Sequence, residues 1–220
     1  MIDALETAAP PRLGFAVEGI EALPAAAPTL GLRLRIEADG GRAVRAIGLA
    51  VRVRIAAPRR RHAPGERERL RELFGPERDW GRSLAAVPWT QATLQVGPFA
   101  GETRVEVALP CTYDFEVASA KYLAALEDGE VPLELLFGGA LFYDGPDGRL
   151  QTAMVPWDRE ASAKLPLSTW RAALDAAFPD GAWLRVRRDV LARLQSYRSR
   201  AGFTTWEETL GALLDAEGQP

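Results

Sequence analysis

The chain has 220 residues, of which 47% are hydrophobic and 26% are charged, and its formal net charge is −3. This composition is typical of a soluble globular protein with one sizeable core, and no apolar run approaches the roughly 20 residues that span a bilayer. The one histidine, His62, and the one cysteine, Cys111, exclude an internal disulfide and leave too few ligands for a zinc or iron–sulfur site within one chain.

The first part of the chain predicts strands. Residues 13–20 alternate loosely and suit an edge strand, whereas residues 30–37 and 44–55 alternate cleanly between apolar and charged side chains. The sequence Asp39-Gly40-Gly41 between the two clean segments is a turn signal. We therefore expect these two segments to pair as a hairpin that covers a core on one side only.

The middle of the chain predicts one helix at residues 64–74 and a series of strands. The stretch 110–139 reads as strand, short helix and strand, and we expect it to form the centre of the fold with Leu133, Leu135 and Phe137 buried. Residues 75–88 are expected to be irregular. The strands predicted in this part of the chain are at residues 90–96, 103–109, 113–117, 131–143 and 150–155.

After Trp157 the hydrophobic period changes from two to nearly four residues, which indicates helices at residues 168–177 and 189–200 and from residue 206 onward. The predicted fold class is α+β: a mainly antiparallel β-sheet or sandwich of seven or eight strands with short inserted helices, followed by a C-terminal layer of three helices. The division falls between residues 1–160 and 161–220, which we expect to pack together as one structural unit.

Arginines are concentrated in the predicted hairpin. Arg33, Arg35, Arg52 and Arg54 occupy alternate positions on its two strands, so the hairpin would bring them onto one outer face. Four like charges this close repel one another unless acids cover them, and the planar donor fork of arginine suits a carboxylate. The pattern predicts a partner-binding surface, and internal neutralisation by acids of a neighbouring strand is the alternative.

Two further segments extend this hypothesis. The run Arg59-Arg60-Arg61-His62 is interpreted as the solvated end of a long strand, with a basic clamp for a polyanion as the alternative, and Arg59 is included in the predicted surface. Trp157, Asp158 and Arg159 lie where the predicted sheet meets the helices. We include all three in the surface, because a tryptophan beside clustered charges is typical of a binding edge.

The sequence lacks the motifs of several large enzyme classes, including a glycine-rich phosphate loop, a dinucleotide fingerprint, a nucleophile elbow and a His-Glu-x-x-His metal motif. Carboxylates need no motif to act as acids and bases. An enzyme that uses Asp114, Glu116, Asp144 and Asp158 therefore stays an alternative. We expect no metal and no other cofactor.

Several strings of the sequence are distinctive: Arg59-Arg60-Arg61, Pro110-Cys111-Thr112-Tyr113-Asp114-Phe115-Glu116-Val117, Ala120-Lys121-Tyr122, Asp128-Gly129-Glu130-Val131-Pro132-Leu133, Val155-Pro156-Trp157-Asp158-Arg159-Glu160 and Trp206-Glu207-Glu208. In these strings the chain resembles an uncharacterised bacterial protein family of unknown function. The resemblance covers nearly the whole chain and carries no catalytic or binding residue. It implies a link with uptake nickel–iron hydrogenases and hence an accessory role.

The function that these observations favour is that of a non-catalytic accessory or protein-interaction protein, with a role in hydrogenase assembly or electron transfer implied by the resemblance. The expected partner is another protein with an acidic surface. A polyanion-binding module is a further alternative, although the negative net charge disfavours nucleic acid. The acidic N-terminus lacks the layout of a signal peptide and predicts a cytoplasmic protein. The oligomeric state is open.

Overall fold

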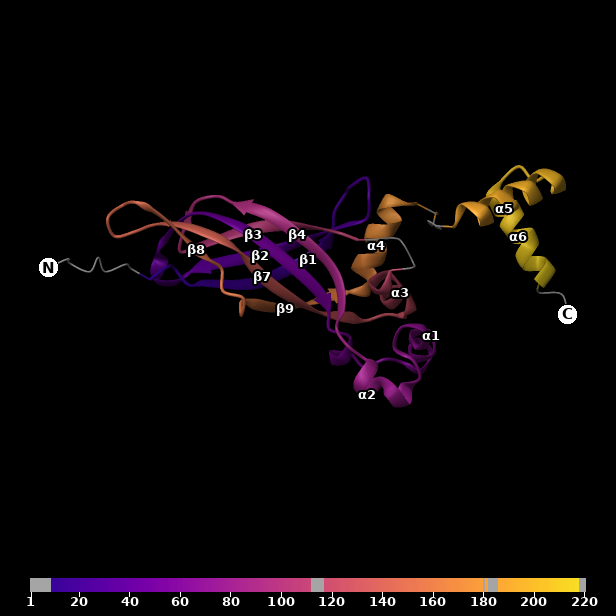
Figure 1. Ribbon diagram of the computed structural model, residues 1–220, viewed down its shortest axis with the longest axis horizontal. Coiled ribbons are helices and arrows are strands. Elements are labelled where there is room, and N and C mark those ends of the chain that lie inside the picture. The colour runs from indigo at the N-terminus through magenta and orange to yellow at the C-terminus, as the bar shows by residue number, and fades with distance from the viewer. Residues whose placement is uncertain (1–8, 112–116, 180, 182–185, 218–220) are drawn as a thin grey trace. The chain divides into compact units, whose positions relative to one another are not determined.

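The structure is a computed structural model that describes residues 9–111, 117–179, 181 and 186–217. Contacts within the chain divide it into two compact units, Met1–Ala182 and Trp183–Pro220. The boundary that we expected near residue 160 therefore lies at 182–183 in the pattern of contacts. Each unit is described by itself below (Figure 1).

The first unit is built on two antiparallel sheets, which confirms the predicted α+β class with a β-sandwich. The described residues form nine strands. Sheet A has the order β1 (Leu13–Ala22), β2 (Thr29–Ala38) and β6 (Glu102–Pro110). Sheet B has the order β4 (Val87–Val96), β3 (Ala43–Ile55), β7 (Glu130–Asp144) and β8 (Leu150–Met154), with β5 (Phe99–Ala100) paired to β3 and β9 (Glu160–Pro166) paired to β7.

The alternation of the strands explains why two sheets pack face to face. Every second residue of β2 and β3 is buried, and the apolar rows of both sheets belong to one core. Phe137 of β7 is 1% exposed and stacks on Phe15 of β1 with ring centroids 4.1 Å apart, so the stack joins the two sheets. Leu133 and Leu135 are 1% and 0% exposed, which confirms their predicted burial.

The predicted hairpin of segments 30–37 and 44–55 is wrong, although both strands exist. β2 pairs with β1 and β6, whereas β3 pairs with β4, β5 and β7. Asp39–Gly41 is a 3₁₀ turn by which the chain passes from sheet A to sheet B. A period of two fixes which face of a strand is buried but not its neighbour, and two strands in opposite sheets bury their apolar faces equally well.

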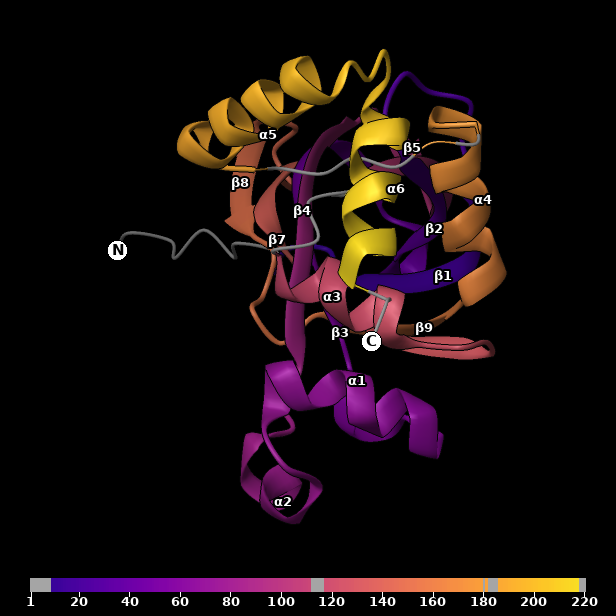
Figure 2. The same cartoon turned by 90° about the vertical axis from the view of Figure 1, so that its right-hand side faces the viewer.

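In the described part of the first unit, four α-helices accompany the sandwich: α1 (Pro64–Phe74), α2 (Trp80–Ser83), α3 (Ala118–Ala125) and α4 (Leu167–Ala177). α1 has the predicted bounds and packs against α3, while α4 packs against β1, β2 and β9 (Figure 2). Residues 75–88, expected to be irregular, contain the 3₁₀ turn Glu77–Asp79 and α2. Side-chain hydrogen bonds from Trp80 to the Gly75 carbonyl and from Ser83 to the Phe74 carbonyl hold this turn.

β5 and β9 were not predicted. β9 turns only small side chains, Ala161 and Ala163, and then Leu165 towards the core, so its period of two is faint in the sequence. The strand predicted at residues 113–117 falls almost entirely outside the described residues.

The second unit consists, in its described part, of α5 (Arg188–Ala201) and α6 (Trp206–Glu217). Gly202, in the left-handed conformation with φ 76°, ends α5. A capping box begins α6: the Glu208 N–H donates to Thr205 Oγ1 at 3.1 Å, and the Thr205 N–H donates to the Glu208 carboxylate at 3.2 Å. With α4, these are the three helices predicted at the C-terminal end.

Candidate functional site

The outer surface of sheet A carries a network of ion pairs among Glu18, Arg35, Glu37, Glu102 and Arg104. We call these residues, together with Arg33 on the same side of β2, the charged face. Arg35 lies 3.6 Å from Glu18, 2.5 Å from Glu37 and 3.3 Å from Glu102. Arg104 binds Glu18 and Glu102 at 3.0 and 2.5 Å, and its hydrogen bond lowers the pKa of the Glu102 carboxyl. Of the predicted arginines, Arg35 is thus neutralised within the chain, while Arg33 is exposed and forms no ion pair with a described residue.

The other predicted arginines lie on the outer surface of sheet B. Because β2 and β3 belong to opposite sheets, Arg52 and Arg54 face away from the arginines of β2, and the four do not form one patch. Arg54 and Arg59 share a single carboxylate, Glu134, at 2.7 and 3.1 Å. Arg52 is exposed and has no ion-pair partner among the described residues. At this end of sheet B, one carboxylate therefore pairs with two arginines, and Arg52 adds a third positive charge without an ion-pair partner among the described residues.

Among the described residues of the first unit, the three most exposed large apolar side chains lie on β8 and in the loop after it. Leu150 is 64% exposed, Met154 73% and Trp157 91%. Met154 lies opposite Ala140 of β7, and the Val155 N–H donates to the Gly139 carbonyl. Trp157 was predicted as a surface residue, whereas the two β8 side chains were not. β8 pairs with no described strand other than β7, so its other side is a free sheet edge.

Between Leu136 and Phe142 of β7, the outer surface of sheet B carries only glycine and alanine on β7 and on the facing part of β3. In the register of β3 and β7, Ala50 lies opposite Gly138 and Gly48 lies opposite Ala140. A shallow groove of about 330 Å³ runs beside this row, walled by Thr93 and other residues of β4. We call Gly48, Ala50, Gly138 and Ala140, with Met154 beside them, the bare face.

The fold itself does not require glycine at two positions of the bare face. A Cβ on Gly138 would have no atom within 4 Å, and one on Gly48 would meet only Gln95 Oε1 at 3.7 Å, an ordinary contact. Gly139 differs, because its φ is 130° and a Cβ there would lie 1.9 Å from the Gly48 carbonyl oxygen. The missing side chains at Gly48 and Gly138 thus leave open space that the chain could fill without strain.

A buried polar network lies at the start of α1, where the sequence predicted a solvated basic run. Arg60 binds both carboxylate oxygens of Glu66 at 2.7 and 3.0 Å, and the two side chains are 10% and 2% exposed. Glu66 also accepts the N–H groups of Ala63 and Glu127, at 2.8 and 2.9 Å. Burial alone would raise the pKa of Glu66, but the hydrogen bonds from Arg60 and from the two backbone groups outweigh burial and lower the pKa to about 2.

His62, at the end of the same run, is also buried rather than solvated. It is 7% exposed, and its Nε2 lies 2.9 Å from the Tyr122 hydroxyl of α3. Its ring meets Trp80 edge-on with centroids 5.6 Å apart. Burial, and then the charge of Arg60, lower the pKa of His62. Arg60 and His62 therefore bind parts of the fold together, which leaves Arg59 and Arg61 as the exposed members of the run.

The described carboxylates proposed as catalytic do not converge. Asp144 binds Arg45 at 2.8 Å, at the turn between β7 and β8. Asp158 lies 3.5 Å from Arg159, whose carbonyl accepts the Phe137 N–H. Phe137 is seven residues before Asp144 on β7, a distance of about 23 Å along the strand. Asp114 and Glu116 lie outside the described residues, and no group of three or more potential metal ligands occurs within the described part of the chain.

None of the described helices is long and apolar enough to cross a membrane. Two solved structures that match the chain are a late embryogenesis abundant protein (11% identity, TM-score 0.33, covering 70% of each chain) and the CARDB domain of a Pyrococcus furiosus protein in complex with di-metal ions (11% identity, TM-score 0.29, covering 71% of this chain and 92% of that one). A β-glucosidase from Kluyveromyces marxianus matches with 10% identity and a TM-score of 0.26, over 70% of this chain and 15% of its own. These TM-scores are too low to carry an argument about function.

No curated protein matches the sequence. The model of one protein family, described as a family of unknown function (DUF6084), matches residues 10–220, nearly the whole chain. The chain therefore belongs to this family of unknown function.

Proposed function

We propose that this protein is a non-catalytic accessory protein that binds another protein through the bare face and the free edge of β8. The observation that carries the proposal is the run from Leu150 to Trp157, where three large apolar side chains are 64%, 73% and 91% exposed on and beside an edge strand. Contiguous exposed apolar side chains mark protein-interaction sites, and tryptophan is enriched among the residues that dominate binding energy.

The backbone of β8 supports the same conclusion. Its five residues, Leu-Gln-Thr-Ala-Met, carry no charge and no proline, the devices that normally block pairing at a sheet edge. Because the Val155 N–H bonds to β7, alternation along an antiparallel strand directs the N–H groups of Thr152 and Met154 away from β7. A strand of the partner can therefore add to this edge through backbone hydrogen bonds.

The bare face allows the partner to approach the sheet closely. Neither backbone conformation nor packing requires glycine at positions 48 and 138, in contrast to Gly139. A partner that lies flat on the sheet would explain why these two positions have no side chain. At one end of this surface, Arg52, Arg54 and Arg59 contact the single carboxylate Glu134 or none. The surplus of positive charge favours a partner whose surface is acidic.

The resemblance to a bacterial family linked with uptake nickel–iron hydrogenases makes a hydrogenase component the first partner to test, in assembly or in electron transfer. A cytoplasmic location in a bacterial host is part of this proposal. The binding surface is argued from exposed residues and a free sheet edge, whereas the identity of the partner rests on the resemblance, so the two parts of the proposal can fail independently.

The test is a pair of substitutions that fill the bare face without disturbing the fold. The tagged protein captures its partner from an extract of the native host, and the purified partner is then titrated against the Gly48→Gln, Gly138→Gln double variant. We expect binding to weaken at least about 100-fold, because the new side chains occupy the contact area. The thermal midpoint should stay close to that of the unaltered protein, since both positions have room for a side chain.

The matched control is Gly81→Gln in α2, where a Cβ would also have no atom within 4 Å. This variant should bind the partner with unchanged affinity. Unaltered binding by the double variant of the bare face, with the fold intact, would contradict the proposal.

A further inference from the structure

The second unit exposes apolar side chains that a stable helical pair would bury. Within its described part, the small Thr209 is the only buried residue. Leu210 and Leu213 of α6 are each 37% exposed, and Leu214 is 69% exposed. A unit of roughly 40 residues or fewer seldom buries enough surface to be stable alone. The apolar side of α5 and α6 therefore requires a cover.

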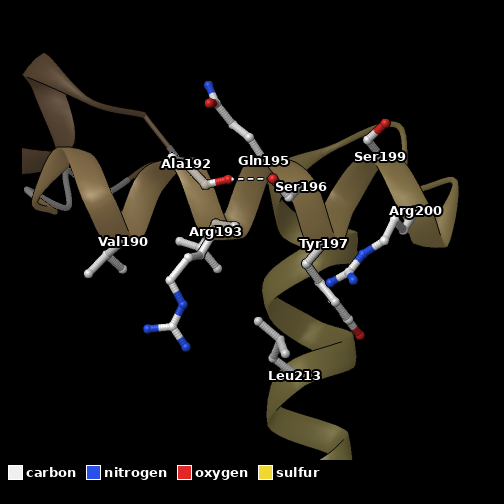
Figure 3. Close-up of a pocket in the computed structure, with 10 residues that line it drawn as sticks. Val190, Ala192, Arg193, Gln195, Ser196, Tyr197, Ser199, Arg200 and Leu213 are labelled. Carbon is white, nitrogen blue, oxygen red and sulfur yellow. Dashed lines mark hydrogen bonds between the residues drawn. The ribbon is translucent and has the colours of Figure 1, made fainter.

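An open cleft of about 1010 Å³ is lined mainly by α5, and Leu213 of α6 also lines it. Val190 and Tyr197 of α5 and Leu213 of α6 contribute apolar side chains to it, and Arg193 and Arg200 of α5 lie beside them (Figure 3). The cleft thus combines apolar walls with a basic rim. An amphipathic helix with acidic flanks has the chemistry that fits such a cleft.

Two contacts link the helices of the unit near the turn between them. The Arg198 guanidinium lies 4.9 Å from the centre of the Trp206 ring, and Tyr197 contacts Phe203 with ring centroids 6.0 Å apart. These contacts join the end of α5 to the start of α6.

α5 and α6 carry charges of opposite sign that form no ion pairs with described residues. Neither Arg193 nor Arg200 of α5 forms an ion pair with a described residue, and the same holds for Glu207 and Asp215 of α6. Within one copy these groups do not pair. Two copies related by a two-fold axis could bring the acids of each α6 to the arginines of the other α5, because a two-fold interface repeats every contact.

We propose that this cleft takes α6 of a second copy of the chain, so that the two helical pairs form a four-helix dimer. Leu210, Leu213 and Leu214 have the i, i+3, i+4 spacing of a helix that anchors in an apolar groove. The acids that flank them, Glu207 and Asp215, meet the basic rim of the partner's cleft. The helical unit is then a dimerisation element, independent of the surface on β8.

Sedimentation velocity on two charge-reversal variants of the full chain, each alone and then mixed, tests this proposal. One variant carries Arg193→Glu and Arg200→Glu, and the other carries Glu207→Arg and Asp215→Arg. The unaltered protein should be a dimer. Each variant alone should dimerise at least about 100-fold more weakly, because like charges then face each other. An equal mixture should restore the dimer, because both of its contacts are again between opposite charges.

The control is Leu150→Glu on β8, which should leave the dimer intact. A monomeric unaltered protein would overturn the proposal, as would charge variants that each remain dimeric. Far-ultraviolet circular dichroism checks that both variants keep their helices. Folded variants whose mixture stays monomeric would overturn it as well.

Discussion

The two outer faces of the sandwich are built from the same kind of strand but have opposite surfaces. On the charged face, arginines and glutamates alternate with the buried leucines of β2, and Arg35 and Arg104 each bind several carboxylates. On the bare face, glycine and alanine occupy the outward positions of β3 and β7. A surface that satisfies its own charges needs only water, whereas an apolar surface beside a free edge gains from a partner.

The largest loss of stability should come from a substitution in the core between the two sheets. Phe137→Ala removes the ring that stacks on Phe15 and leaves a cavity between the sheets. We expect the free energy of unfolding to fall by roughly 3–5 kcal/mol, measured by urea denaturation. A loss below about 1 kcal/mol would mean that the two sheets do not share one core at this position.

The buried ion pair between Arg60 and Glu66 should contribute more to stability than the exposed pairs of the charged face do. Glu66→Gln leaves Arg60 buried without its counter-charge and should lower the free energy of unfolding by about 3 kcal/mol. The pKa of Glu66 is lowered from 4.5 to about 2 by folding, so its contribution is complete above about pH 4.5 and is lost as the pH falls towards 2. Urea denaturation across this range should show the loss in the unaltered protein and a smaller one in the variant. Equal pH dependence in both would contradict the assignment.

The charged face itself should be insensitive to single substitutions. Arg104 binds Glu18 and Glu102, but its side chain is 60% exposed. Water and salt screen such pairs, so Arg104→Ala should change the thermal midpoint far less than Glu66→Gln does. The Arg104→Ala variant should bind the partner with unchanged affinity. A loss of partner binding in this variant, with the fold intact, would mean that the interaction surface lies on sheet A and not on sheet B.

Alternation and the helical period in the sequence were sufficient to predict most strands, the described helices other than α2, and the buried row that includes Leu133 and Phe137. They could not predict the pairing of β2 and β3, because a period of two carries no information about neighbours. The burial of Arg60 could not be predicted either, because its guanidinium also donates to the carbonyl groups of Asp128 and Glu130, which lie far along the chain.

The candidate site was predictable only in part. Trp157 stood out because three charged residues follow it in the sequence. The bare face did not, because Gly48 and Gly138 lie on strands far apart in the chain, and the cross-strand register alone brings them together. Met154 joins them through its pairing with Ala140. A glycine in a strand is ambiguous in a sequence, since it marks a bulge as often as a close approach.

Amide hydrogen exchange on both sheets, with and without the purified partner, tests the central claim most directly. The measurement compares the β8 segment, residues 150–155, with β6 at the edge of sheet A. We predict that the partner slows exchange on β8 by about tenfold or more, with the largest change at Thr152 and Met154, and leaves β6 unchanged. Slower exchange on β6 with no change on β8 would contradict the account.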